Sequence, residues 1–358
     1  MTTINEIFRA FAPEYIERYP NMPGHHRKVI AAIINCRSGK YGTTVYRCLK
    51  CGQKHFISRS CGNRHCPMCQ YHKTQAWLEK QLNKQVGGQH FMITFTLPEE
   101  IRPIARQNQK LVYQALFKAS SQALKKLAQD KRFIGTSLPG FTGVLQTWGR
   151  QLQYHPHIHY IVVSGGLSEN RDAWIPSRKD FFVHEKPLSI IFRAIFMKEM
   201  KKAGLSGQIP SSVWKKDWVV DSEAMESADN SIRYLAPYVF RVAISNSRIV
   251  KVEDRFVYFK YRKHSSKQMK TMRLEVMEFI RRFLQHVLPS GFMKVRHFGF
   301  MNPNCCTPHE TIVKLIEDHT GETLKKVEPS EPPKQYCSDC GGELVYLWSI
   351  IPMFHQRE

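Results

Sequence analysis

The sequence lacks any apolar run that could cross a membrane. No stretch of about 18 consecutive apolar residues occurs in its 358 residues. The first twenty residues carry charges throughout and have no uninterrupted apolar segment, so they do not resemble a signal peptide. Internal repeats and low-complexity tracts are missing as well. We therefore expect a globular, cytoplasmic protein.

Acidic residues are also in short supply. The chain has 30 Asp and Glu against 53 Lys and Arg, which gives a formal net charge of +23. An excess of this size indicates a polyanionic partner. A membrane surface would also attract a basic protein, but the sequence has no long basic amphipathic helix with a Trp, Phe and Leu face. Nucleic acid is thus the expected partner.

Ten cysteines are present, and in the cytoplasm thiols stay reduced, so metal binding is expected rather than disulfide formation. Cys48-Leu-Lys-Cys51 and Cys66-Pro-Met-Cys69 are two C-x-x-C pairs separated by 14 residues. Two such pairs predict one closed, structural zinc site with four thiolates. Thioredoxin-like redox chemistry is the rival interpretation, but the presence of two pairs argues against it. Nearby residues that could replace a ligand are Cys61 and His65, and also Cys36 and His55.

A third C-x-x-C pair, Cys337 and Cys340, has no second pair after it. Cys305 and Cys306, which lie 31 residues upstream of that pair, could supply two further thiolates. The sequence therefore offers a second zinc site made of these four residues.

The segment YHPHIHYIVVSGG (154–166) places histidines at every second position before a β-branched run. On a strand, His157 and His159 share one face with their Cα atoms about 6.6–6.8 Å apart, so both can reach one metal ion. If residues 141–149 fold back against this strand, Gln146 lies opposite His157 and becomes a candidate third ligand. Gln146 could equally be a satisfied polar group at a sheet edge. A hydrolytic zinc site that also uses His155 is a further alternative.

A short helix is predicted over 227–240, and it contains Tyr234-Leu-Ala-Pro-Tyr238. Four helical positions place the two phenols on one face, one turn apart. An aromatic stripe packed on the core is the simpler interpretation of such a pair.

Three motifs in order, SCGNRHCPMCQ, HPHIHYIVVSGG and YLAPYVFRVAISNSRI, resemble the rolling-circle transposases of the insertion sequence 91 family. These belong to the two-tyrosine branch of the HUH superfamily of single-strand endonucleases. The resemblance implies that His157 and His159 bind the catalytic Mg2+ or Mn2+. It also implies that Tyr234 and Tyr238 are nucleophiles that form 5′-phosphotyrosine intermediates on single-stranded or extruded DNA at the element ends. A prokaryotic, nucleoid-associated location follows from the same resemblance.

Two other functions remain open at this point. A rolling-circle plasmid replication initiator of the same superfamily would share the catalytic core. A non-catalytic zinc-module DNA-binding protein would require both the histidine and the tyrosine motif to be accidental.

The expected fold class is α+β, with an antiparallel sheet covered by helices on one face, like the RRM or ferredoxin-like palm of HUH endonucleases. We expect four consecutive regions: N-terminal helices (1–40), a zinc-binding domain (41–88), the catalytic domain (89–265), and a C-terminal helical region with a cysteine-containing tail (266–358). Within them, a strand is expected at 212–220, a hairpin at 248–263 and a helix at 268–288.

Overall fold

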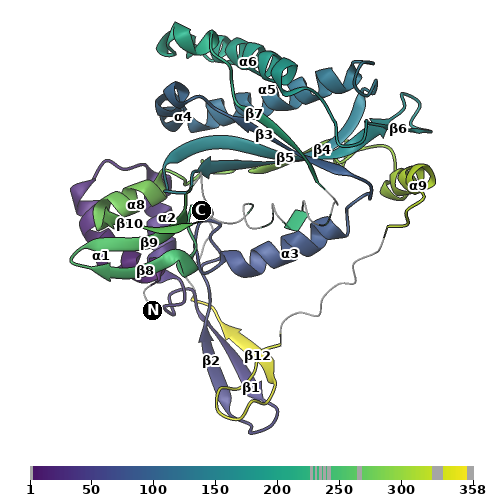
Figure 1. The fold of residues 1–358 in the computed structure, drawn as a ribbon. Helices are drawn as coiled ribbons and strands as arrows, with labels where there is room; N and C mark the ends of the chain where they lie inside the picture. Colours follow the sequence, from purple (N-terminus) through teal and green to yellow (C-terminus); the bar gives the residue numbers. More distant parts are fainter. Residues whose placement is uncertain are drawn as a thin grey trace. The chain divides into compact units, whose positions relative to one another are not determined.

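The computed structural model describes residues 3–225, 229, 232–233, 236, 239, 243–263, 268–324 and 334–352, without the side chains of 71–73 (Figure 1). Contacts divide the chain into two units, each assembled from separated segments. The first unit comprises Met1–Lys73, Phe240–Val287 and Glu328–Glu358, and the second comprises Thr74–Val239 and Leu288–Val327. The sequence suggested four consecutive regions, whereas contacts join segments that lie far apart along the chain.

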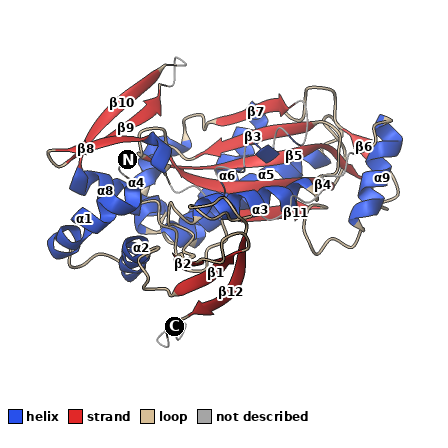
Figure 2. Cartoon of the chain, turned by 90° about the horizontal axis from the view of Figure 1, so that it is seen from below, coloured by secondary structure: helices blue, strands red, loops and turns tan. Residues whose placement is uncertain are grey.

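The second unit is built on an antiparallel sheet with the strand order β11-β4-β5-β3-β7, and β6 pairs with β5 (Figure 2). The strands are β3 (His90–Thr96), β4 (Leu138–Trp148), β5 (Tyr154–Leu167), β6 (Trp174–Pro176), β7 (Val220–Met225) and β11 (Val295–Gly299). Every pairing in this sheet is antiparallel. The predicted fold class, α+β with an antiparallel sheet, is confirmed.

One face of this sheet is apolar because alternate residues of its strands carry large hydrophobic side chains. Phe95, Leu145 and Ile158 are fully buried on that face. Helices α5 (Gln109–Gln129) and α6 (Glu185–Lys202) cover it and contribute Leu116 and Phe192 to the same core (Figure 1). Each such side chain stabilises the fold by roughly 1.5–3 kcal/mol. Because the even-numbered residues of β5 point into this core, the histidines at its odd-numbered positions must lie on the opposite face of the sheet.

The second unit also contains shorter helices: η1 (Glu99–Ile101), α4 (Arg102–Gln107), η2 (Ser206–Gln208), η3 (Ser211–Trp214), most of α3 (Gln70–Leu82), and α9 (His309–Thr320). Helix α9 buries Ile312 and Ile316 against Val163 and Phe300. It ends at Thr320, and the residue that caps it, Gly321, has a φ of 71°, a left-handed conformation that favours glycine.

The described part of the first unit contains helices and two small sheets. Its helices are α1 (Ile4–Arg18), α2 (Gly24–Asn35) and α8 (Val276–Leu284), with a short η4 (Asn246–Arg248). One sheet has the order β10-β9-β8, formed by β8 (Ile249–Glu253), β9 (Phe256–Arg262) and β10 (Met269–Glu275). The other has the order β12-β1-β2, formed by β1 (Thr43–Cys48), β2 (Lys54–Ser58) and β12 (Leu344–Ile350).

Two predicted elements are wrong in their type or limits. Residues 268–288 form strand β10 before helix α8, because β10 pairs along its whole length with β9, and Glu275 then caps α8 by accepting the Met277 and Glu278 N–H groups. The expected strand at 212–220 begins only at Val220, because Val213 and Trp218 turn into the core as part of an irregular segment. The expected hairpin at 248–263 is present.

Candidate functional site

The histidine segment is the middle of strand β5, and its odd-numbered residues face away from the helices α5 and α6. Ile158 and Tyr160 are fully buried in the helix-covered core. The rings of His157 and His159 therefore lie on the other face, with centroids 4.7 Å apart. Strand β4 pairs with β5 in the register that sets Gln146 opposite His157. The register assumed from the sequence is therefore confirmed.

Each of these two rings is held through its Nδ1 atom. His157 Nδ1 lies 2.6 Å from the backbone oxygen of His155, and a carbonyl can only accept, so this nitrogen donates the hydrogen bond. His159 Nδ1 lies 2.9 Å from Thr94 Oγ1. In His157 the proton thus sits on Nδ1, which leaves the Nε2 lone pair as the metal-binding position.

The electrostatic surroundings keep the imidazoles neutral. Burial lowers the pKa of His155 and of His159 to about 4, and it holds the pKa of His157 well below its ordinary value. The neighbouring histidines also lower the pKa of His157, since several positive rings at this spacing would repel one another. Neutral imidazole is the form that binds a metal ion.

Gln146 lies opposite His157, on the same face of the sheet, and its amide oxygen is not used in a hydrogen bond among the described residues. Its Nε2 donates to the backbone oxygen of Trp148 at 2.9 Å, which fixes the orientation of the amide. Its Oε1 is buried, and within the described part of the chain it accepts no hydrogen bond. A buried oxygen of this kind costs roughly 1–3 kcal/mol unless something binds it. The arrangement therefore fits a third metal ligand.

The alternative of a three-histidine zinc site is not favoured by the geometry. The His155 ring lies 5.0 Å from that of His157. Among the described residues, two groups of three or more histidine, cysteine or carboxylate side chains have all their ligand atoms within 4.8 Å of one another. Both groups consist of cysteine alone. The three histidines therefore do not converge on one ion as a set.

Two further residues influence these histidines and were not predicted from the sequence. Thr94, opposite His159 on β3, orients that ring. Arg102 begins helix α4, and its charge lowers the pKa of His155 and His157, so its guanidinium lies within electrostatic reach of both. The Arg102 side chain is 23% exposed and 3.7 Å from Glu99 Oε1, and its buried Nε has no hydrogen-bond partner among the described atoms. Only the turn after β3 brings it here.

The predicted nucleophiles Tyr234 and Tyr238 lie outside the described residues. In the same segment Ile232, Ala236 and Val239 are helical and buried, and their spacing of four and three residues marks one helix face.

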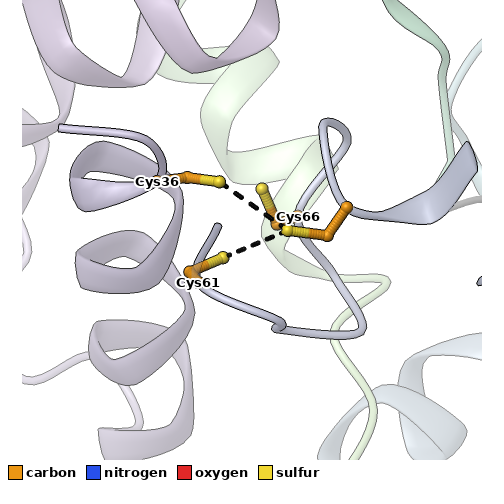
Figure 3. Close-up of side chains that lie close together, drawn as sticks. Cys36, Cys61 and Cys66 are labelled. Atoms are coloured by element: carbon orange, nitrogen blue, oxygen red, sulfur yellow. Dashed lines mark hydrogen bonds between the residues drawn. The ribbon is translucent and has the colours of Figure 1, made fainter. Parts of the chain in front are cut away.

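A cluster of four cysteines lies in the first unit, formed by Cys36, Cys61, Cys66 and Cys69. The labelled side chains of Cys36, Cys61 and Cys66 gather at one place (Figure 3). Cys69 Sγ is 3.6 Å from Cys61 Sγ and 3.7 Å from Cys36 Sγ. In a tetrahedral site with Zn–S bonds of about 2.3 Å, neighbouring sulfurs lie about 3.8 Å apart. The cluster therefore has the dimensions of a closed zinc site.

The N-terminal helices support this cluster. Asn5 of α1 is fully buried, and its Nδ2 lies 3.5 Å from Cys66 Sγ and 2.9 Å from the backbone oxygen of Ile33 in α2. A fixed amide donor beside a thiolate holds that ligand in its orientation.

The predicted zinc grouping is corrected by the structure. Cys48 and Cys51 do not lie with Cys66 and Cys69 but form a second cluster with Cys337 and Cys340. Cys61, named as a substitute, and Cys36 complete the first cluster, whereas His65 belongs to neither. The sequence spacing suggested the wrong partners because β1 and β2 carry the first C-x-x-C pair away from the second.

Comparison with known proteins gives two family matches and two relatives. The family model described as "Putative transposase" matches residues 140–309, and the model described as "Transposase zinc-binding domain" matches residues 7–97. A protein of Sinorhizobium fredii named "Putative transposase y4qJ" is 34% identical over 354 residues, which cover 93% of this chain and 88% of the relative. The "Transposase for insertion sequence element IS801" of Pseudomonas savastanoi pv. phaseolicola is 24% identical, with coverage of 90% and 83%. No solved structure matches the chain.

The chain belongs to the insertion sequence 91 family of transposases. The resemblance inferred from its three motifs is thereby confirmed, and the transposase carries an N-terminal zinc-binding domain. Within the described residues, this transposase has no helix that is both long and apolar enough to cross a bilayer.

The second predicted zinc site of the transposase is also corrected. Cys305 packs in the apolar cluster around Phe300 and Ile312 in the second unit, and Cys306 is exposed. Cys337 and Cys340 lie in the first unit with Cys48 and Cys51. The pair at 305 and 306 therefore does not join the pair at 337 and 340 in a metal cluster.

Proposed function

We propose that this transposase nicks and rejoins single-stranded DNA through tyrosine nucleophiles at the histidine face of its sheet, as part of rolling-circle transposition. The observation that carries the proposal is the convergence of two neutral imidazoles, His157 and His159, with the unpaired amide oxygen of Gln146. Two imidazoles and an amide leave positions open for a phosphate, as a catalytic metal site requires.

The residues fit a divalent cation. Bound there, Mg2+ or Mn2+ would polarise the scissile phosphate and neutralise the charge that develops on its oxygens. The chain's own contribution is to hold His157 and His159 by their Nδ1 atoms and to fix the Gln146 amide through Trp148. These three metal ligands are therefore held in position before the substrate binds, so catalysis does not require them to rearrange.

Arg102 is proposed to contact the same phosphate. Its positive charge lowers the pKa of His155 and of His157, and its buried Nε has no hydrogen-bond partner among the described atoms. A guanidinium offers two parallel donors to a phosphate, so it can orient the phosphorus for attack as well as attract it.

The nucleophile is proposed to be Tyr234 or Tyr238. The tyrosine hydroxyl gives up its proton as its oxygen forms a bond to phosphorus, the bond to the 3′ oxygen breaks, and that oxygen takes up a proton and leaves as a 3′-hydroxyl. The 5′-phosphate stays on the tyrosine, so the phosphodiester energy is kept and a later 3′-hydroxyl can reverse the step. Two tyrosines allow two successive exchanges.

The substrate is proposed to be single-stranded or extruded DNA. The metal ligands are side chains on the face of a sheet, and His157 is buried. A phosphate must reach this floor together with a tyrosine, and a complementary strand would obstruct that approach. The net charge of +23 supplies affinity for DNA in either form.

Covalent trapping tests the proposal. Labelled single-stranded DNA from an element end, incubated with Mn2+, is expected to give an adduct that survives denaturation and maps to a peptide with Tyr234 or Tyr238. Tyr234→Phe with Tyr238→Phe should remove the adduct, and Tyr19→Phe, at the exposed end of α1, should not. An adduct that persists in the double variant would show that another residue is the nucleophile.

The two tyrosines are expected to have different tasks. They are one helical turn apart in the sequence pattern, about 6 Å, while attack requires an approach of about 3–3.5 Å. One single Tyr→Phe variant should lose initial cleavage, and the other should cleave but fail to complete transposition. If both single variants cleave and transpose like wild type, this division of labour is wrong.

A further inference from the structure

The second cysteine cluster, Cys48, Cys51, Cys337 and Cys340, brings together residues from the N-terminal and C-terminal parts of the chain. It has the dimensions of a metal site. Cys48 Sγ lies 3.4 Å from Cys340 Sγ, and Cys51 Sγ lies 3.9 Å from Cys337 Sγ. All four sulfurs lie within 4.8 Å of one another. These distances bracket the edge of about 3.8 Å expected of a tetrahedral zinc–thiolate site, and a disulfide would require about 2.05 Å.

The two C-x-x-C turns of this cluster have the same backbone arrangement. In each turn a glycine follows the second cysteine, and its N–H donates to the carbonyl of the first: Gly52 to Cys48 and Gly341 to Cys337, both at 3.0 Å. Both glycines have positive φ, 75° and 69°, a conformation that other residues rarely adopt. The Cys51 N–H also points to Cys48 Sγ at 3.5 Å. Two matched turns that face each other are typical of a zinc ribbon, and residues 43–59 and 334–352 are called the ribbon below.

The ribbon depends on the C-terminal tail. Strand β12 pairs with β1 from Cys48–Leu344 to Thr43–Ile350, and the Leu49 N–H donates to the backbone oxygen of Glu343 at 2.9 Å. A Cβ atom at Gly342 would lie 2.7 Å from Cys48 Sγ, so glycine lets the tail approach the thiolate. Residues almost 300 positions apart in sequence thus share one small sheet.

We propose that Cys48, Cys51, Cys337 and Cys340 bind a second structural zinc ion, separate from the zinc at Cys36, Cys61, Cys66 and Cys69. The zinc-binding family match ends at residue 97, so it does not reach the tail ligands. With three short strands, the ribbon has little core of its own, and four thiolates around one ion would supply its stability.

The zinc content of the full-length protein tests this site. Wild type is expected to hold two zinc ions per chain, Cys337→Ser with Cys340→Ser one, and the control Cys305→Ser with Cys306→Ser two. In the 337/340 variant, proteolysis should also begin to cut the tail. One zinc per wild-type chain would overturn the proposal even if the variants failed to fold, and so would two in the 337/340 variant.

A different observation concerns the face of the ribbon that carries Val45. Phe56 and Trp348 flank Val45 across the three strands, and they are 66% and 45% exposed. Lys54 and Arg47 follow on the same face, and Lys54 Nζ lies 5.4 Å from the centre of the Trp348 ring. The hairpin from 43 to 59 contains four basic residues and no acidic one.

We infer that this face binds single-stranded DNA by stacking bases on Phe56 and Trp348 while the basic side chains contact phosphates. Exposed aromatic rings beside cations are the means by which proteins bind single strands without reading their sequence. The inference rests on the proposed function, since it assumes that the substrate is single-stranded DNA.

DNA affinity and covalent cleavage, measured on the same samples, separate the two proposals. Phe56→Ala with Trp348→Ala should weaken binding of a labelled oligothymidine at least about tenfold, and it should retain two zinc ions and adduct formation at saturating DNA. The control Ile57→Ala with Tyr346→Ala removes exposed side chains from the opposite face and should bind like wild type.

Unchanged DNA affinity in the Phe56 and Trp348 variant would overturn the inference. If that variant also changed a wild-type dimer into a monomer, the face would be an interface between copies. If the wild-type protein forms no covalent adduct, the proposed function is contradicted. The role of the ribbon face is then judged from the DNA affinities of wild type and variant alone.

Discussion

The sheet of the second unit and the cysteine clusters of the first unit both gather metal-ligating side chains, but with opposite chemistry. Each cluster closes four soft thiolates around one position and leaves no room for a substrate. The sheet site offers two neutral imidazoles and one amide oxygen, which leaves most of a cation's coordination open. Closed sites hold a fold together, and open sites take part in reactions.

The difference also lies in what supports each site. The histidines rest on a large apolar core under α5 and α6, so their position does not need a metal ion. The clusters lie among loops and short strands, where the ion itself would supply much of the folding free energy. Removing the metal ions should therefore abolish catalysis at the sheet site without unfolding the sheet, and it should unfold the segments that hold the two cysteine clusters.

The largest expected effect is that of His157→Ala with His159→Ala. Loss of the cation removes several kcal/mol of transition-state stabilisation, so strand cleavage should fall by about a thousandfold or more. Zinc content, thermal stability and DNA binding should stay as in wild type. Cleavage at the wild-type rate by this variant would refute the open metal site.

A large loss of stability is expected for Cys66→Ser with Cys69→Ser. Two of four thiolates disappear, and the free energy of unfolding should fall by several kcal/mol, since zinc binding and folding are coupled here. Thermal denaturation and zinc analysis measure it. Cys305→Ser with Cys306→Ser is the matched control. Equal stability of the 66/69 variant and wild type would show that the cluster is not structural.

A smaller effect is expected for Arg102→Ala, which should lower the cleavage rate by about ten- to a hundredfold through the lost phosphate contact. Arg102→Lys should recover only part of it, because a lysine ammonium is a point charge without the paired donors. Arg132→Ala, an exposed residue paired with Asp130, is the control. Single-turnover cleavage at saturating DNA distinguishes the outcomes, and full activity of Arg102→Ala would remove this residue from the site.

The smallest effect is expected for Gln146→Ala. One of three protein ligands is lost, and the affinity for Mn2+ should fall by about tenfold while cleavage is regained at high Mn2+. Gln129→Ala, exposed at the end of α5, should leave the Mn2+ dependence unchanged. A Gln146→Ala variant with wild-type Mn2+ dependence would return Gln146 to the role of a structural amide.

The sheet site could be predicted from the sequence because its geometry is local. Alternation along one strand sets His157 and His159 on one face, and a short connection between β4 and β5 sets Gln146 opposite His157. Arg102 could not be predicted in the same way, because it lies outside these two strands, at the start of helix α4.

The cysteine clusters show the limit of local reasoning. The spacing of two C-x-x-C pairs predicted zinc, but the true partners of Cys48 and Cys51 are almost 300 residues away in the tail. Similarly, helical periodicity over 268–288 hid a strand, because the pairing of β10 with β9 depends on a neighbour that the window does not contain. In both cases contacts between residues outside the local window determine the structure, and a short-range sequence pattern does not contain them.

Metal content at both kinds of site, measured on the same samples, tests the account most directly. Mn2+ binding followed by electron paramagnetic resonance, with zinc determined in parallel, is expected to give one Mn2+ and two zinc ions per wild-type chain. The His157→Ala, His159→Ala variant should keep two zinc ions and bind no Mn2+. If this variant binds Mn2+ as wild type does, or loses zinc, then the open catalytic site and the closed structural sites are not separate.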